Sequence, residues 1–72
     1  MQHFNNLYHL DKVDIDILDK LYRNARATIQ EIATGVGRSR VSVYRKIKNM
    51  EKAGVIEGYT VKVDWTKIGN YR

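Results

Sequence analysis

The chain has 72 residues and no cysteine, which leaves room for one small domain held together by its apolar core, without disulfides or thiolate-bound metals. Its net charge of +5 favours an anionic partner such as a phosphate polymer, although charge does not determine fold. No apolar run approaches the roughly 18 residues of a membrane span, and the N-terminus lacks the pattern of a secretion signal. We therefore expect a cytoplasmic protein with no membrane partner.

The first predicted helix begins after Asp11 and ends near Asn24. Asp11 and Asp14 stand where carboxylates can accept the free backbone N–H groups of a first turn and face the positive end of the helix dipole. The apolar residues at helical spacing, which we expect to face the core, are Val13, Ile17, Leu18, Leu21 and Ala25. Ile15 and Tyr22 lie to the side of this stripe.

A second, shorter helix is predicted to begin at Thr28 and to end near Thr34. Thr28 and Glu31 have the spacing of a capping box, in which each side chain accepts a hydrogen bond from the other residue's backbone N–H. The apolar positions at helical spacing are Ile29, Ile32, Ala33 and Val36. Gly35 and Gly37 then predict a sharp turn that uses a left-handed backbone conformation.

The third predicted helix, residues 39–53, carries most of the positive charge. Residues 1–31 hold four Lys or Arg against five Asp or Glu, whereas residues 38–52 hold six against one. Ser39 is the expected N-terminal cap, and Gly54 stands where helices commonly end. Because one segment accounts for the whole charge imbalance, we expect the anionic partner to meet this helix.

The spacing of this region is typical of a helix-turn-helix. Ala33 is a small residue where the helices approach, Gly37 follows four residues later in the turn, and Val43 follows ten later as an inward anchor. On the third helix an apolar stripe lies opposite the residues Val41, Arg45, Lys48 and Lys52. A helix anchored on one side and cationic on the other can enter the major groove of DNA.

Several short motifs along the chain belong together: "LD" at 10–11, "IA" at 32–33, "VG" at 36–37 and above all "GVIEGYTVKVD" at 54–64. In these motifs the sequence resembles the N-terminal DNA-binding domain of the Lrp/AsnC family of prokaryotic transcription regulators. The resemblance covers roughly residues 10–69 and implies a winged helix-turn-helix that regulates transcription through double-stranded DNA. One departure is Arg38, where the family commonly has an apolar residue.

The resemblance also implies a homodimer on a pseudo-palindromic site. Four apolar residues, Phe4, Leu7, Tyr8 and Ile15, could form the dimer interface or fold back onto the same chain, and the sequence leaves both open. Family members normally continue into an α/β domain that forms oligomers and binds amino acids, whereas this sequence stops at Arg72. It could be a separate domain or a short regulator, and we expect no cofactor and assign no small-molecule effector.

After the third helix, apolar and polar residues alternate from Tyr59 to Trp65, which is the period of a strand with one covered face. Either Glu57 and Gly58 form a hairpin tip, or one strand runs from Ile56 to Val63. We therefore expect a mainly α fold, a three-helix winged helix-turn-helix with a short C-terminal β wing or strand. Residues 10–64 would form this domain, residues 1–9 an N-terminal extension and residues 65–72 a tail or linker.

The expected base-reading residues lie in the first half of the third helix, which penetrates the groove deepest. They are Val41, Ser42, Arg45 and Lys48. Arg45 is the strongest of these, because an arginine can donate two parallel hydrogen bonds to guanine. The residues expected to contact the phosphate backbone are Thr28, Arg38, Ser39, Arg40, Tyr44, Lys46, Lys52 and Lys62.

Other functions find less support in the sequence. The serines of the third helix have no histidine plausibly in reach, and His3 and His9 lack a third metal ligand, so we expect neither an enzyme nor a metal site. No glycine-rich loop follows a strand to hold a nucleotide. The alternative from another class is a winged helix that serves as an adaptor and binds an acidic protein.

Overall fold

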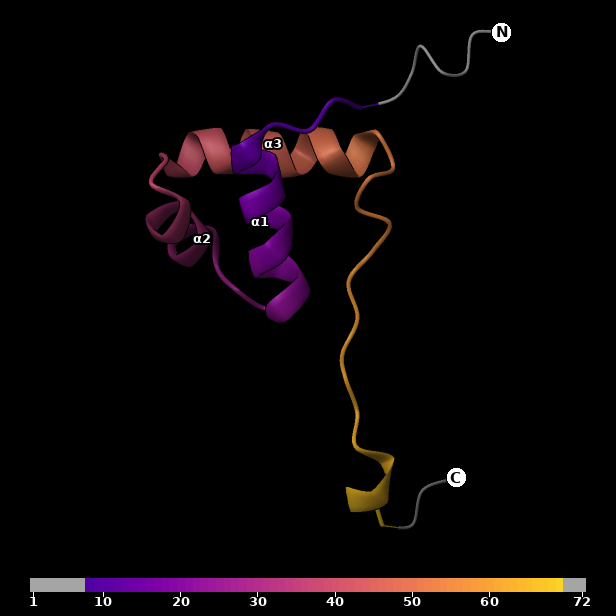
Figure 1. The fold of residues 1–72 in the computed structure, drawn as a ribbon. Helices are drawn as coiled ribbons and strands as arrows, with labels where there is room; N and C mark the ends of the chain where they lie inside the picture. Colours follow the sequence, from indigo (N-terminus) through magenta and orange to yellow (C-terminus); the bar gives the residue numbers. More distant parts are fainter. Residues whose placement is uncertain (1–7, 70–72) are drawn as a thin grey trace, which may run out of the picture.

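A computed structural model describes residues 8–69, which form three α-helices followed by an extended segment (Figure 1). α1 spans Lys12–Arg23, α2 spans Ile29–Val36 and α3 spans Arg40–Lys52, and a short 3-10 helix, η2, spans Trp65–Lys67. In Figure 1, α1 crosses α3 steeply and α2 lies beside the N-terminal end of α3. This arrangement confirms the three predicted helices.

The N-terminus of α1 is closed by a reciprocal pair of carboxylates. The backbone N–H of Asp14 donates to Asp11 Oδ1 at 2.8 Å, and the backbone N–H of Asp11 donates to Asp14 Oδ2 at 3.1 Å. Two donors that have no partner inside the helix are thereby satisfied. The predicted helix start is confirmed, and Asp14 is buried, with 2% of its surface exposed.

α2 ends two residues later than the sequence predicted. Gly35 and Val36 belong to the helix, and of the two glycines in this region Gly37 is the one with a positive φ, of 72°. Because a residue without a Cβ adopts this left-handed conformation at no steric cost, the helix ends at Gly37. The carbon chain of Lys20 lies against Gly35, so a Cβ at this position would displace the end of that flexible side chain.

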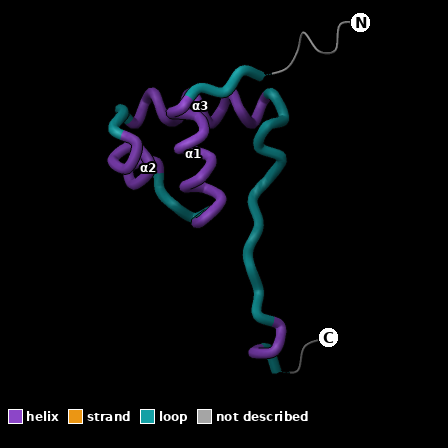
Figure 2. Tube along the Cα trace, in the orientation of Figure 1, coloured by secondary structure: helices purple, strands orange, loops and turns teal. Residues whose placement is uncertain are grey.

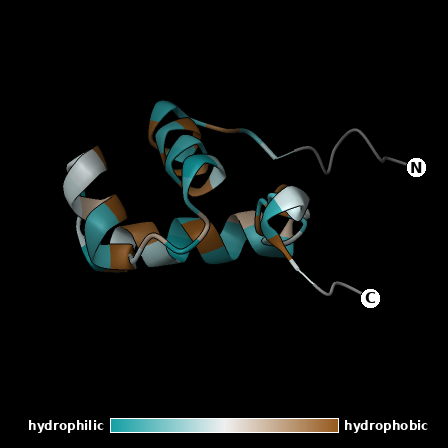
Figure 3. Cartoon of the chain, turned by 90° about the horizontal axis from the view of Figure 1, so that it is seen from below, coloured by the Kyte–Doolittle hydropathy of each residue, from teal (hydrophilic) through white to brown (hydrophobic). Residues whose placement is uncertain are grey.

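The core lies where the three helices meet. Its buried members are Ile17 from α1, Ile32 and Ala33 from α2, and Val43, Ile47 and Met50 from α3. Hydrophilic and hydrophobic stretches alternate along the helices, as expected where each has one buried side (Figure 3). The predicted inward stripe of the third helix is therefore confirmed.

The chain beyond α3 leaves the helices. The N–H of Gly54, at a φ of 81°, donates to Glu51 O, and the N–H of Val55 donates to Met50 O, which closes the helix end. Residues 57–64 then run outward without reversing direction, so Glu57 and Gly58 form no hairpin tip (Figure 2). Residues 8–69 contain no strand, because the backbone of this segment has no neighbouring strand with which to pair.

Two further observations concern the N-terminal end of the chain. Tyr8, which we assigned to the N-terminal extension, packs against the core. His3, Phe4 and Leu7 lie outside the described residues.

Within residues 8–69 no helix is long and apolar enough to cross a membrane. In the same residues no three His, Asp or Glu side chains are grouped as metal ligands.

Candidate nucleic-acid interface

The turn between α2 and α3 fixes the angle at which α3 leaves the core. The N–H groups of Gly37 and Arg38 both donate to Ala33 O, at 2.9 and 3.1 Å. Ser39 then caps α3, and its hydroxyl accepts from the N–H of Ser42 at 3.1 Å. Because Ala33 is buried and these bonds involve backbone atoms, the start of α3 is held firmly against α2.

The outward side of α3 carries three of the four residues that we expected to read bases. Val41 is 67% exposed, and Arg45 and Lys48 are also exposed, whereas Val43 and Ile47 on the opposite side are buried. Ser42 is half-buried beside this surface. The helix is therefore anchored by its apolar side and presents its cations to the solvent.

Arg45 and Lys48 differ in their surroundings. Within the described part of the chain Arg45 forms no ion pair. The Nζ of Lys48, by contrast, lies 3.3 Å from Glu51 Oε1 and 5.4 Å from the centre of the Tyr44 ring. Arg45 is thus available to an external acceptor, while Lys48 already has an acidic and an aromatic neighbour.

Lys46 differs from our expectation that it contacts phosphate. Its Nζ lies 3.0 Å from Asp11 Oδ2 and 3.5 Å from Asp14 Oδ1, so it joins α3 to the N-terminus of α1. The hydrogen bond to Asp11 raises the pKa of Lys46. Asp14 Oδ1 is buried and accepts no hydrogen bond among the described residues, which leaves the Lys46 ammonium as its compensating charge.

Replacing Lys46 with glutamine is expected to lower the free energy of unfolding by about 1 to 2 kcal/mol, because Asp14 Oδ1 then loses its compensating charge. Urea unfolding of the variant measures this difference. Lys52→Gln is the matched control, since Lys52 is exposed on the same helix and forms no ion pair among the described residues. Equal stability of the two variants would contradict a structural role for Lys46.

The cluster of Asp11, Asp14 and Lys46 makes the stability of the fold depend on pH. The backbone N–H of Asp14, and after it Lys46, hold the pKa of Asp11 below its ordinary value of 3.8. The folded chain therefore binds this proton less readily than the unfolded chain. The resulting stabilisation is present when the pH is above the ordinary pKa of Asp11. It is lost as the pH falls through the lowered pKa that Asp11 has in the folded chain.

The other residues expected at the DNA backbone lie at the start of α2, in the turn before α3, on α3 and on the extended segment. Thr28 and Ser39 cap the N-termini of α2 and α3 through their hydroxyl oxygens, so each hydroxyl proton can still be donated to a phosphate. Arg38 donates to the carbonyl of Gly37 at 3.2 Å. Three further residues, Arg40, Tyr44 and Lys52, are exposed on α3, and Lys62 is exposed on the extended segment.

The sequence did not identify two residues beside this surface. Tyr59 Oη donates to Glu51 Oε2 at 2.6 Å. Partial burial of the ring and the hydrogen bond to Glu51 raise the pKa of Tyr59 to about 12, and the same hydrogen bond lowers the pKa of Glu51. The three-residue spacing of Lys48 and Glu51 could have predicted their ion pair, but nothing in the sequence indicates that Tyr59 folds back onto α3.

A capped helix, a glycine turn and an outward cationic helix define a helix-turn-helix. Residues 10–57 match the profile of the winged helix-turn-helix DNA-binding family. The chain belongs to this family and is a DNA-binding domain of the Lrp/AsnC type.

Individual relatives support the assignment. The chain is 42% identical over 60 residues to the HTH-type transcriptional regulator LrpA of Pyrococcus abyssi, covering 83% of this chain and 43% of that protein. The structure of Bacillus subtilis LrpC superimposes with a TM-score of 0.80 at 31% identity, over 86% of this chain and 44% of LrpC. An AsnC-family transcriptional regulatory protein from Pyrococcus furiosus gives a TM-score of 0.77 at 34% identity, over 81% of this chain and 37% of that one. The chain thus spans less than half the length of each.

Proposed function

We propose that the chain binds double-stranded DNA by inserting α3 into the major groove, and that it does so as a transcription regulator. The observation that carries this proposal is the exposed side of α3, where Arg45 and Lys48 face outward while Val43 and Ile47 are buried. An α-helix is about 10–12 Å across with its side chains, which matches a major groove about 12 Å wide.

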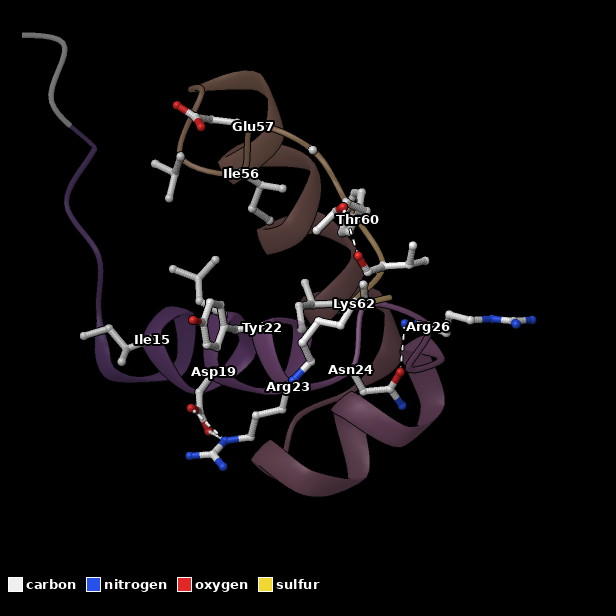
Figure 4. Close-up of a pocket in the computed structure, with 17 residues that line it drawn as sticks. Ile15, Asp19, Tyr22, Arg23, Asn24, Arg26, Ile56, Glu57, Thr60 and Lys62 are labelled. Carbon is white, nitrogen blue, oxygen red and sulfur yellow. Dashed lines mark hydrogen bonds and ion pairs between the residues drawn. The ribbon is translucent and has the colours of Figure 1, made fainter. Parts of the chain in front are cut away.

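Within this proposal the residues have separate tasks. Val41, Ser42, Arg45 and Lys48 would contact base edges, with Val41 placed to meet a thymine methyl. The phosphate contacts would come from Thr28, Arg38, Ser39, Arg40, Tyr44 and Lys52. We leave Lys46 out of this set because Asp11 and Asp14 hold its ammonium. We also leave out Lys62, because it lines the groove between α1 and the segment after α3 (Figure 4).

The relatives favour regulation over the alternatives. The proteins from Pyrococcus and Bacillus are named transcriptional regulators, and none of the names cited above describes an enzyme. Nothing in the comparisons supports the adaptor that binds an acidic protein. A regulator of this kind would act in the cytoplasm, on the nucleoid.

We expect binding to random-sequence duplex to weaken steeply with salt. If about five phosphate contacts form, log K should fall against log salt concentration with a slope of about −4 to −5, because each contact releases condensed counterions. Fluorescence anisotropy of a labelled duplex between low and physiological salt measures this slope. A complex that is insensitive to salt would contradict the proposed role of α3.

Selection of bound fragments from a random duplex library would show what the domain reads. We propose a homodimer, so the selected site should be a pseudo-palindrome whose half-site centres lie about 34 Å apart, one turn of the duplex. A single unrepeated site would favour binding by one copy.

A groove of about 940 Å³ between α1 and residues 55–62 is our candidate for the surface between the two copies. Its apolar lining includes Ile15, Tyr22 and Ile56, which Figure 4 shows around the opening. Tyr22 is 90% exposed and Ile15 is 54% exposed, so burial against a second copy would remove apolar surface from water.

We propose further that residues 59–63 form the expected strand when another strand lies beside them. Their backbone is already extended, and apolar residues alternate with Thr60 and Lys62. Tyr59, Val61 and Val63 are all exposed, and a second strand would pair the backbone N–H and C=O groups of this segment.

A further inference from the structure

One carboxylate joins the recognition helix to the segment that follows it. Tyr59 Oη donates to Glu51 Oε2 at 2.6 Å, and the other oxygen of Glu51, Oε1, lies 3.3 Å from Lys48 Nζ. The Tyr44 ring lies on another side of the same ammonium, with its centre 5.4 Å away. The position of Lys48 is therefore restrained by two neighbours on α3, and Glu51 is in turn held by Tyr59.

Glu51 remains charged in this arrangement. Each of its oxygens has a partner, and the hydrogen bond from Tyr59 and the nearby Lys48 lower its pKa. The phenol keeps its proton at neutral pH, because the pKa of Tyr59 is about 12. A full negative charge thus lies permanently next to a cation that we expect to meet DNA.

We propose that Glu51, held by Tyr59, is a positioning residue that restrains Lys48 and lowers the affinity of α3 for DNA of arbitrary sequence. The inference rests on the proposed function, in which Lys48 faces the groove. Non-specific binding consists almost entirely of attraction between cations and phosphates. A carboxylate beside Lys48 offsets part of that attraction whatever the sequence of the duplex.

The restraint on Lys48 lowers the affinity for a specific DNA site less than it lowers the affinity for random-sequence duplex. A lysine ammonium has three donors, and one of them faces Glu51. The other two can be donated to a base edge while the ion pair persists, and they then point in directions that Glu51 and the Tyr44 ring help to set. Glu51 therefore raises the ratio of specific to random binding.

The test compares Glu51→Gln with Asp16→Asn in the 72-residue chain. Both changes remove one carboxylate that pairs with a lysine of its own helix, but Asp16 lies on α1, where its partner is Lys12 at 3.1 Å. We expect Glu51→Gln to bind a random duplex about fivefold more tightly at low salt, and Asp16→Asn less than about twofold more tightly. Glu51→Gln should raise the affinity for the selected site by a smaller factor than it raises the affinity for the random duplex.

A second background separates positioning from a general effect of charge. In Lys48→Gln chains, the difference in random-duplex affinity between Glu51→Gln and Asp16→Asn should become much smaller, because the residue through which Glu51 acts is gone. Tyr59→Phe keeps the ring but frees one oxygen of Glu51, and it should tighten random binding by about twofold. Circular dichroism of every variant shows whether it is folded, and Tyr59→Phe provides the test if Glu51→Gln is not.

The outcomes distinguish this inference from the function on which it rests. If the unaltered chain binds no duplex, or binds it without salt dependence, the proposed function fails. If the unaltered chain binds as expected but Glu51→Gln and Asp16→Asn behave alike, the positioning role of Glu51 is wrong and the function stands.

Discussion

Replacing Arg45 with alanine is expected to weaken binding to the selected DNA site by about 1 to 3 kcal/mol and to relax specificity at one base pair. Arg45 is exposed on the outward side of α3 and forms no ion pair among the described residues, so its guanidinium can donate two hydrogen bonds to guanine. Competition binding with duplexes altered one base pair at a time measures both effects.

Lys12→Ala is the control for the loss of one positive charge. Lys12 is exposed at the start of α1 and pairs with Asp16 at 3.1 Å. It should change affinity slightly and equally for all duplexes. If Arg45→Ala also weakened every duplex equally, Arg45 would contact phosphate rather than bases.

Replacing Ile47 with alanine is expected to lower the free energy of unfolding by about 2 to 5 kcal/mol, because the change removes buried methyl and methylene groups and leaves a cavity between the helices. Ile47 is 6% exposed and packs among residues of all three helices. A domain of this size has little stability to lose. Much of the population should therefore be unfolded at 37 °C, with DNA binding reduced in proportion.

Val41→Ala provides the comparison on the same helix. Val41 is 67% exposed, so its truncation should change stability by less than about 0.5 kcal/mol. Urea unfolding followed by circular dichroism measures both variants. A small loss for Ile47→Ala would show that α3 is not anchored by its apolar side, and the proposed presentation of Arg45 would lose its basis.

Local sequence determined most of the helical framework. The caps at Asp11, Thr28 and Ser39 depend on residues three positions apart, which a helix start always brings together. The left-handed residue at Gly37 likewise depends on the absence of its own side chain. The position of Gly35 was misjudged because two neighbouring glycines look alike in sequence, although only one ends the helix.

The outward residues of α3 followed from periodicity in the same way. Once Val43, Ile47 and Met50 are buried, the geometry of the helix places Arg45 and Lys48 on the opposite side. The three-helix framework, the family and the exposed cationic side of α3 were therefore accessible from the sequence. Which bases Arg45 and Lys48 contact remains a prediction.

Only the tertiary structure decided which charged residues are already engaged. Lys46 and Asp11 are 35 positions apart, and Tyr59 reaches Glu51 only because the chain turns back at Gly54. No periodic pattern encodes such contacts, since they depend on how elements pack and not on spacing within one element. The missing strand has the same cause: alternation shows that residues 59–63 can pair, but pairing requires a second strand, which residues 8–69 do not supply.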